Sequence, residues 1–230
     1  MLGGKARLWH TAGHFLRSES SLSSPSVSLK NVARSQSRLC ARSLNGDLIE
    51  RHAPRVGASI NWQCMSVIDE VLVANEIYSR THELRKLTAR PERKLAVLTC
   101  MDTRLSIRTL GLKTGEAHII RNAGGIVTDD TLRSLVVSHH LLGTEEIMVI
   151  NHTDCGLMYT SEQDLRATIQ NRTGTAAVVP AFFYAFENVE ENVRHQLQKL
   201  RTHPWIPESV AVRGFVYDVE TGALREIKGA

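Results

Sequence analysis

Short apolar runs bounded by polar or turn-forming residues recur along the chain after its first 60 residues. Three of them, at about 94–99, 117–121 and 146–151, are rich in β-branched residues and have the length of buried strands. Segments with helical spacing of apolar residues separate these runs, and strands that alternate with helices form parallel sheets with covering helices. A further run at 209–219 turns into one at 224–227, which is expected to complete one sheet edge. The pattern predicts an α/β fold with a parallel-centred β-sheet flanked by α-helices.

Three helices are expected from the same pattern. The first spans about 67–87 and ends before a proline. The second begins after Thr128 and ends at Gly143, because threonine caps the first turn of a helix and glycine adopts the left-handed conformation of a helix end. The third spans about 180–200. These helices are expected to cover the sheet.

Two groups of side chains on the second and third helices call for an explanation. His139 and His140 lie at the C-terminus of the second helix, where the helix dipole favours a cation, and this position explains them better than metal binding or proton shuttling. Phe182, Phe183 and Phe186 cluster at the start of the third helix. Core packing is expected for the three rings, with a dimer contact or a pocket wall as the alternative.

The first 60 residues differ in composition from the rest of the 230-residue chain. They hold nine Lys and Arg but three Asp and Glu, and they are rich in serine. Such a segment buries too little apolar surface to fold alone. One helical face carries its apolar residues, Leu8, Trp9, Ala12, Phe15 and Leu16. We therefore expect a leader at 1–60, interpreted as a mitochondrial transit peptide, before a catalytic domain at 61–230. A disordered basic tail, or a start at Met65 in the cytoplasm, is the alternative.

Several classes of function are disfavoured by the sequence. No stretch approaches the roughly 18 apolar residues of a membrane span. The basic residues of the leader are spaced singly, without the interleaved aromatic rings that stack on nucleic acid, so no nucleic-acid partner is expected. No glycine-rich phosphate-binding loop is present, which disfavours a nucleotide site.

Potential metal ligands lie where two of the expected strands end. Cys100 follows the strand at 94–99, and His152 and Cys155 follow the strand at 146–151. The carboxyl ends of parallel strands share one edge of a sheet, which is where ligands bind in open α/β sheets. Two thiolates and one imidazole make a three-ligand zinc site, the number typical of catalytic zinc. Cysteines packed as small hydrophobic residues, or a disulfide between Cys100 and Cys155, are the alternatives.

Two further pairs of residues accompany these ligands. Asp102 and Arg104 follow Cys100 at intervals of two, so an extended chain would project all three to one side, and an arginine keeps a carboxylate ionised and oriented. An ordinary surface ion pair is the alternative. Gly124 and Gly125 follow the strand at 117–121, and they permit either the close backbone approach that a substrate or a partner subunit needs or a tight strand-to-helix turn.

In combination these motifs resemble a known family. The segments 100–104, Cys-x-Asp-x-Arg, and 152–156, His-x-x-Cys-Gly, resemble the signature of the β-class carbonic anhydrases, and 121–125 resembles that family's glycine-rich segment. The similarity extends from about Ser66 to Ile227. In length and loop composition it is greatest with the short, archaeal and mycobacterial-like branch.

The resemblance implies a lyase that hydrates carbon dioxide reversibly to bicarbonate with a zinc-bound hydroxide. It implies one Zn²⁺ per subunit, held by Cys100, His152 and Cys155, with Asp102 accepting a hydrogen bond from the nucleophile and Arg104 fixing the Asp102 rotamer. In this family the aspartate can instead occupy the fourth position on zinc. An open site is expected near pH 8, because no separate bicarbonate pocket can be identified in the sequence.

The resemblance also leaves alternatives. Hydrolysis of carbonyl sulfide or carbon disulfide uses the same metal chemistry on a neighbouring linear molecule, and a non-catalytic zinc-binding relative could retain the fold. The family implies a homodimer or a higher homo-oligomer, with pocket walls contributed across the interface.

Overall fold

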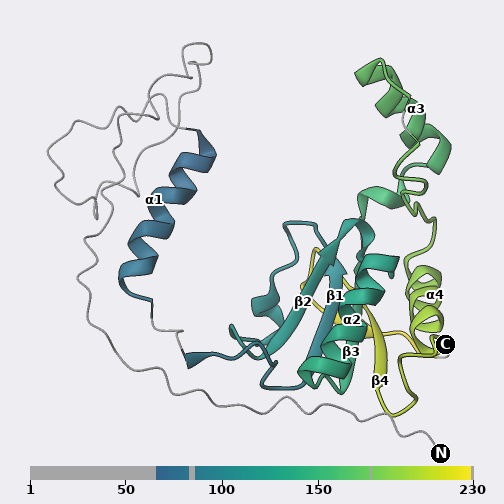
Figure 1. Ribbon diagram of the computed structural model, residues 1–230. Coiled ribbons are helices and arrows are strands. Elements are labelled where there is room, and N and C mark those ends of the chain that lie inside the picture. The colour runs from purple at the N-terminus through teal and green to yellow at the C-terminus, as the bar shows by residue number, and fades with distance from the viewer. Residues whose placement is uncertain (1–65, 83–85, 177, 229–230) are drawn as a thin grey trace, which may run out of the picture. The chain divides into compact units, whose positions relative to one another are not determined.

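The computed structural model describes residues 66–82, 86–176 and 178–228. The chain divides into two units, residues 1–82 and 83–230, and Figure 1 shows the sheet within the second. The expected leader at 1–60, with its amphipathic segment and the alternative start at Met65, lies outside the described residues.

A mixed five-stranded sheet forms the second unit. Its strands are β1 (Leu95–Cys100), β2 (Ala117–Asn122), β3 (Glu146–His152), β4 (Ala211–Tyr217) and β5 (Leu224–Glu226). The spatial order is β2-β1-β3-β4-β5, with parallel pairing throughout except for the antiparallel pair β4 and β5. Figure 1 labels the first four of these strands. The predicted parallel-centred sheet is confirmed, and β5 forms one edge of it as expected.

One face of the sheet packs against helices α2 (Asp129–Leu142) and α4 (Val189–Arg201). Alternate residues of the strands point to this face, because successive side chains of a strand project to opposite sides. Gly214 of β4 lets α4 approach closely, since a Cβ there would lie 2.5 Å from Cγ1 of Val193. The buried members of this cluster include Ala96, Leu98, Ile147, Val149, Leu135, Val193, Leu197 and Leu200.

The other face of the sheet packs against the segments that follow β1 and β3. A buried cluster joins Val97, Ile150 and Tyr217 of the sheet to the candidate ligands Cys100 and Cys155. Short 3-10 helices shape both segments, at Ile107–Leu110 and Gly156–Met158. The candidate metal ligands therefore belong to a packed core and not to a free loop.

Helix ends show where the sequence-based expectations were right and wrong. For α2, the Thr128 side chain accepts a hydrogen bond from the Thr131 N–H, and Gly143 ends the helix with φ 80°, as predicted. Helix α1 (Val67–Arg80) ends at the C-cap Thr81 and does not reach residue 87. Helix α4 begins at Val189 and not at 180, because the Asn188 side chain accepts hydrogen bonds from the first turn.

Helix α3 (Glu162–Thr173) was not predicted. Its only large apolar side chains are Leu165 and Ile169, which are too few to mark a helix in the sequence, and no residue of the helix is buried. None of the described helices is long and apolar enough to cross a membrane.

The two side-chain groups singled out on the helices receive different explanations. His139 contacts the Thr144 carbonyl (2.7 Å) and His140 the Trp205 carbonyl (2.9 Å), which accounts for both rings at the end of α2. The expectation of core packing is wrong for Phe182, whose side chain is exposed, because the segment before α4 is not helical. Phe186 packs at the edge of the second core cluster.

Candidate metal centre

Three potential metal ligands converge at the carboxyl end of the parallel strands. Cys100 ends β1, His152 ends the neighbouring β3, and Cys155 follows three residues later. One ligand atom from each residue lies within 4.8 Å of the other two, and all three residues are buried. A zinc ion bound about 2.3 Å from sulfur and about 2.0 Å from nitrogen can bridge atoms at separations of this order.

The hydrogen bonding of His152 leaves one ring nitrogen available for a metal. Nδ1 lies 2.8 Å from the Thr153 carbonyl, which can only accept, so Nδ1 carries the hydrogen. Nε2 is buried and has no hydrogen-bond partner among the described residues. A buried polar atom without a partner is costly, whereas a metal bound there would satisfy it. The donor set and the orphaned Nε2 together fit Zn²⁺, as predicted.

The two cysteines are free thiols that influence each other's protonation. A hydrogen bond from Cys155 lowers the pKa of Cys100 against the opposing effect of burial, and the same interaction raises the pKa of Cys155. Burial lowers the pKa of His152, but the neighbouring Cys100 and the Thr153 carbonyl outweigh it and raise that pKa overall. Without metal, one thiolate is thus favoured, and metal binding must release the proton of the second thiol.

The glycine pair contacts the first thiolate directly. The Gly124 N–H donates to Sγ of Cys100 at 3.3 Å. Gly124 and Gly125 both have positive φ, 80° and 64°, and a Cβ on Gly125 would lie 2.8 Å from Nδ2 of Asn151. The tight turn expected for this pair is confirmed, and the backbone approaches the chain's own Cys100 and Asn151 closely.

Asp102 and Arg104 form a paired contact beside the three ligands. Nε and Nη2 of Arg104 donate to the two carboxylate oxygens of Asp102 at 3.0 and 2.8 Å, and these hydrogen bonds lower the pKa of Asp102 to about 2. Oδ2 of Asp102 lies 3.9 Å from Nε2 of His152. The chain turns here and is not extended as expected, because the Leu105 N–H donates to the Asp102 carbonyl. This turn brings the Arg104 side chain back onto Asp102.

A second carboxylate, which the sequence did not single out, holds the other side of Arg104. Nη1 of Arg104 donates to Oδ2 of Asp154 at 2.6 Å, and Nη2 donates to the Asp154 carbonyl at 2.9 Å. The Tyr159 hydroxyl donates to the other oxygen of Asp154 at 3.0 Å. Its place within the 152–156 motif was the only sequence feature that pointed to Asp154. The contact with Arg104 spans fifty residues, so it could not be read from the motif.

Arg121 also supports the site without having been singled out. Its Nε donates to the Cys100 carbonyl at 2.9 Å and its Nη2 to the Asp102 carbonyl at 2.6 Å. Arg121 thereby fixes the backbone that presents both Cys100 and Asp102.

Comparison with known proteins places these features in a family. The family model described as carbonic anhydrase matches residues 95–224. The chain is 41% identical over 165 residues to β-carbonic anhydrase 1 of Mycobacterium tuberculosis, covering 71% of this chain and 99% of that protein. It is 38% identical over 183 residues to a carbon disulfide hydrolase of an Acidianus species, covering 69% of this chain and 88% of the relative.

Solved structures agree with the sequence comparison. The carbonic anhydrase of Streptococcus mutans matches with a TM-score of 0.67 and 41% identity, over 71% of this chain and 99% of that one. The chain belongs to the β-class carbonic anhydrase family, which confirms the resemblance seen in its motifs.

Proposed function

We propose that this protein catalyses the zinc-dependent, reversible hydration of carbon dioxide to bicarbonate. The observation that carries the proposal is the orphaned Nε2 of His152, which lies within 4.8 Å of two buried cysteine sulfurs in a chain of this family. Cys100, His152 and Cys155 would hold one zinc ion per chain. Three protein ligands leave a fourth coordination position for water or substrate, as in catalytic zinc sites.

Hydration of carbon dioxide needs a strong nucleophile at neutral pH. When bound, zinc would supply it by lowering the pKa of a bound water toward neutrality. Asp102 orients the nucleophile by accepting a hydrogen bond from it, because the carboxylate is ionised and lies beside the three ligands. Arg104 is a positioning residue that fixes Asp102.

The contacts of Asp102 favour a site in which this carboxylate stays off the metal. Both of its oxygens accept hydrogen bonds from Arg104, and Asp154 holds Arg104 from the other side. Asp102 would have to break these charge-assisted hydrogen bonds to become a fourth ligand. We therefore propose an open site near pH 8, and a crystal structure at that pH with Asp102 bound to zinc would contradict it.

A stopped-flow assay of carbon dioxide hydration on the purified, zinc-analysed protein tests the function. We expect activity that rises from pH 7 to pH 9 and disappears when a chelator removes zinc. Bound zinc without hydration activity across this range would favour a non-catalytic relative of the family.

Hydrolysis of carbon disulfide is the second candidate, favoured by the 38% identity to the Acidianus carbon disulfide hydrolase. Carbon disulfide and carbonyl sulfide are linear molecules that the same nucleophile could attack at carbon. Parallel assays of carbon dioxide hydration and sulfide release on one zinc-loaded preparation separate the candidates. Rapid sulfide release beside negligible hydration would reverse the preference.

A homo-oligomer, at least a dimer, is proposed for the functional state. The support is helix α1, in which all the large apolar side chains except Val73 are 44% to 72% exposed, and apolar surface of this kind is typical of interaction sites. Light scattering coupled to size-exclusion chromatography tests the proposal, and a monomer at micromolar concentration would contradict it. The exposed side chains are Val67, Ile68, Val71, Leu72, Ile77 and Tyr78.

A mitochondrial location is proposed from the composition of residues 1–60 alone. Excess arginine and serine, few acids and an amphipathic segment support a transit peptide. N-terminal sequencing of the native protein from mitochondrial and cytosolic fractions is the test. A mature protein that retains residues 1–60 in the cytosol would contradict the proposal.

A further inference from the structure

Three buried amide side chains form a polar network behind the candidate metal centre. Asn151 lies on β3, one residue before His152, whereas Asn192 and Gln196 lie one turn apart on α4. Their exposed fractions are 1%, 8% and 1%. Amides buried this deeply are retained only when their hydrogen bonds are satisfied, so their partners define what they hold in place.

The network begins and ends in the same loop. The Val127 N–H donates to Oε1 of Gln196 (2.9 Å), Nε2 of Gln196 donates to Oδ1 of Asn192 (2.8 Å), and Nδ2 of Asn192 donates to Oδ1 of Asn151 (2.9 Å). Nδ2 of Asn151 then donates to the Gly124 carbonyl at 2.7 Å. Two helix residues thus tie both ends of the loop at 124–127 to β3.

The direction of these hydrogen bonds is fixed by their two ends. The Val127 N–H can only donate and the Gly124 carbonyl can only accept, so every amide between them has one orientation that satisfies all the contacts. Reversal of any one amide would place two donors or two acceptors face to face. The network therefore specifies a single position for the loop.

This loop carries the backbone group that touches the first metal ligand. The Gly124 N–H donates to Sγ of Cys100 at 3.3 Å, while the Gly124 carbonyl accepts from Asn151. We propose that Asn192 and Gln196 are positioning residues that hold the Gly124 N–H on the Cys100 sulfur. The inference rests on the proposed function, because its consequence for catalysis acts through a metal bound to that sulfur.

A hydrogen bond to a metal-bound thiolate withdraws charge from the sulfur, and such outer partners tune both metal affinity and reactivity. Without the hydrogen bond from Gly124, Cys100 would donate more charge to a bound zinc ion and would weaken its action as a Lewis acid. The midpoint of the pH–activity curve then moves to higher pH. A network that only packed the core would leave this midpoint unchanged.

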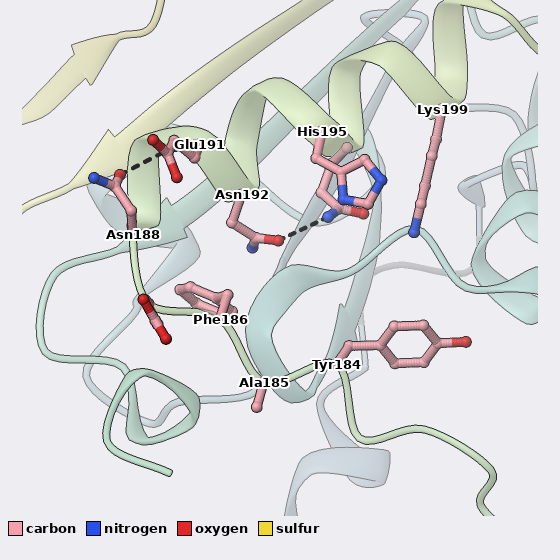
Figure 2. A pocket seen from close by; sticks show the side chains of 10 residues that line it. Tyr184, Ala185, Phe186, Asn188, Glu191, Asn192, His195 and Lys199 are labelled. Carbon is pink, nitrogen blue, oxygen red and sulfur yellow. Dashed lines mark hydrogen bonds between the residues drawn. The ribbon is translucent and has the colours of Figure 1, made fainter. Parts of the chain in front are cut away.

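The helix that carries the network offers a matched control. Asn192, Gln196 and His195 line one pocket of about 480 Å³ next to Phe186, and Figure 2 shows Asn192 projecting from α4 toward that ring. His195 is exposed, lies between the two amides in sequence and takes no part in the network. His195→Leu therefore alters the same helix and the same pocket without breaking the proposed contact.

The experiment compares Asn192→Leu, Gln196→Met and His195→Leu with the native protein. Asn192→Leu removes the central amide of the network, and Gln196→Met removes the amide that contacts Val127. Gln196→Met also keeps the test available if Asn192→Leu does not fold. Each protein is examined in its zinc form by stopped-flow hydration from pH 6 to pH 9.5, and in its Co²⁺ form by the sulfur-to-metal charge-transfer absorption.

For both network variants we expect kcat at pH 7 to fall about 10-fold, with KM within about twofold and the deficit shrinking at high pH. The charge-transfer band should move to longer wavelength, because a thiolate without its hydrogen bond is oxidised more easily. His195→Leu should match the native protein in both measurements.

An unchanged band and an unchanged pH midpoint in both variants, even with lower thermal stability, would show that the amides only pack the core and would overturn the proposal. A loss of kcat that is equal at every pH would overturn it too. The absorption measurement needs no turnover. If the native zinc protein shows no hydration activity but the band still shifts in both variants, the proposed function is refuted and the positioning role stands.

Discussion

Two groups of buried polar side chains lie next to each other at the carboxyl end of β3, and they differ in whether their atoms are satisfied. In the amide network, all six side-chain nitrogen and oxygen atoms of Asn151, Asn192 and Gln196 have hydrogen-bond partners. In the ligand group, Nε2 of His152 has none among the described residues. The other such atom is Oγ1 of Thr99, one residue before Cys100.

The difference separates a scaffold from a binding site. A satisfied amide network gains nothing from a ligand and holds the backbone in one arrangement. A buried imidazole nitrogen between two thiols is stabilised only when something binds it. Mutation of the network is therefore expected to change mainly the position of the backbone that it holds. Mutation of the ligand group is expected to cause loss of the metal.

Replacement of a ligand should give the largest effect. Cys155→Ser removes one of three protein donors, and we expect zinc affinity to fall by at least about 100-fold, with loss of hydration activity, since even outer-shell changes can cost up to about 100-fold. Metal analysis after dialysis, with a hydration assay, measures both. Cys64→Ser makes the same chemical change outside the described residues and should keep zinc, whereas equal zinc content in the two variants would remove Cys155 from the site.

Asp102→Asn should separate metal binding from turnover. The amide cannot accept both hydrogen bonds from Arg104 or orient the nucleophile as a carboxylate does, so we expect full zinc occupancy with kcat lower by about 100-fold. The matched control is Asp130→Asn, since Asp130 also pairs with an arginine, Arg133, but on the exposed surface of α2. A native rate in Asp102→Asn would reject its assigned role.

Gly125→Ala tests the backbone that joins the two groups. A Cβ on Gly125 would meet Nδ2 of Asn151 at 2.8 Å and the Cys100 backbone nitrogen at 3.1 Å, whereas Gly143 shares a positive φ and has nothing within 4 Å. We expect Gly143→Ala to lower the free energy of unfolding by about 1 kcal/mol. Gly125→Ala should cost about 2 kcal/mol more because of the clash. Urea unfolding of the metal-free proteins gives both values, and equal losses would contradict the close approach.

The smallest effect concerns acid stability, to which Asp102, beside the ligand group, contributes and the uncharged amides do not. Arg104 lowers the pKa of Asp102 from 3.8 to about 2. The carboxylate therefore adds stability that is present above pH 3.8 and is lost as the pH falls toward 2. Between about pH 5 and pH 2.5, metal-free native protein should lose on the order of 1 kcal/mol more unfolding free energy than Asp102→Asn. Equal changes in unfolding free energy over this pH range in the two proteins would contradict this linkage.

The features that could be predicted from the sequence were those that depend on a few neighbouring residues. The apolar runs marked β1, β2 and β3, and Cys100 and His152 stood at strand ends, so the sheet and the convergence of the ligands followed. The extent of α4 did not follow, because the Asn188 cap resembles any polar residue of a helix.

Long-range hydrogen bonds were out of reach for a physical reason. Asn192 meets Asn151 across 41 positions, and Gln196 meets Val127 across 69. On the sequence both amides look like the solvated side of an amphipathic helix, and only the packing of α4 against the sheet shows that they are buried. Asp154 escaped notice likewise, since its partner Arg104 comes from another strand end.

A zinc titration of the metal-free protein, followed by carbon dioxide hydration at pH 8, tests directly whether the three ligands hold a catalytic metal. The rate should rise in proportion to added zinc and reach its plateau at one zinc per chain, while Cys155→Ser stays at the uncatalysed rate throughout. A plateau of bound zinc with no gain in rate, or equal activity in Cys155→Ser, would contradict the claim that Cys100, His152 and Cys155 hold a catalytic metal.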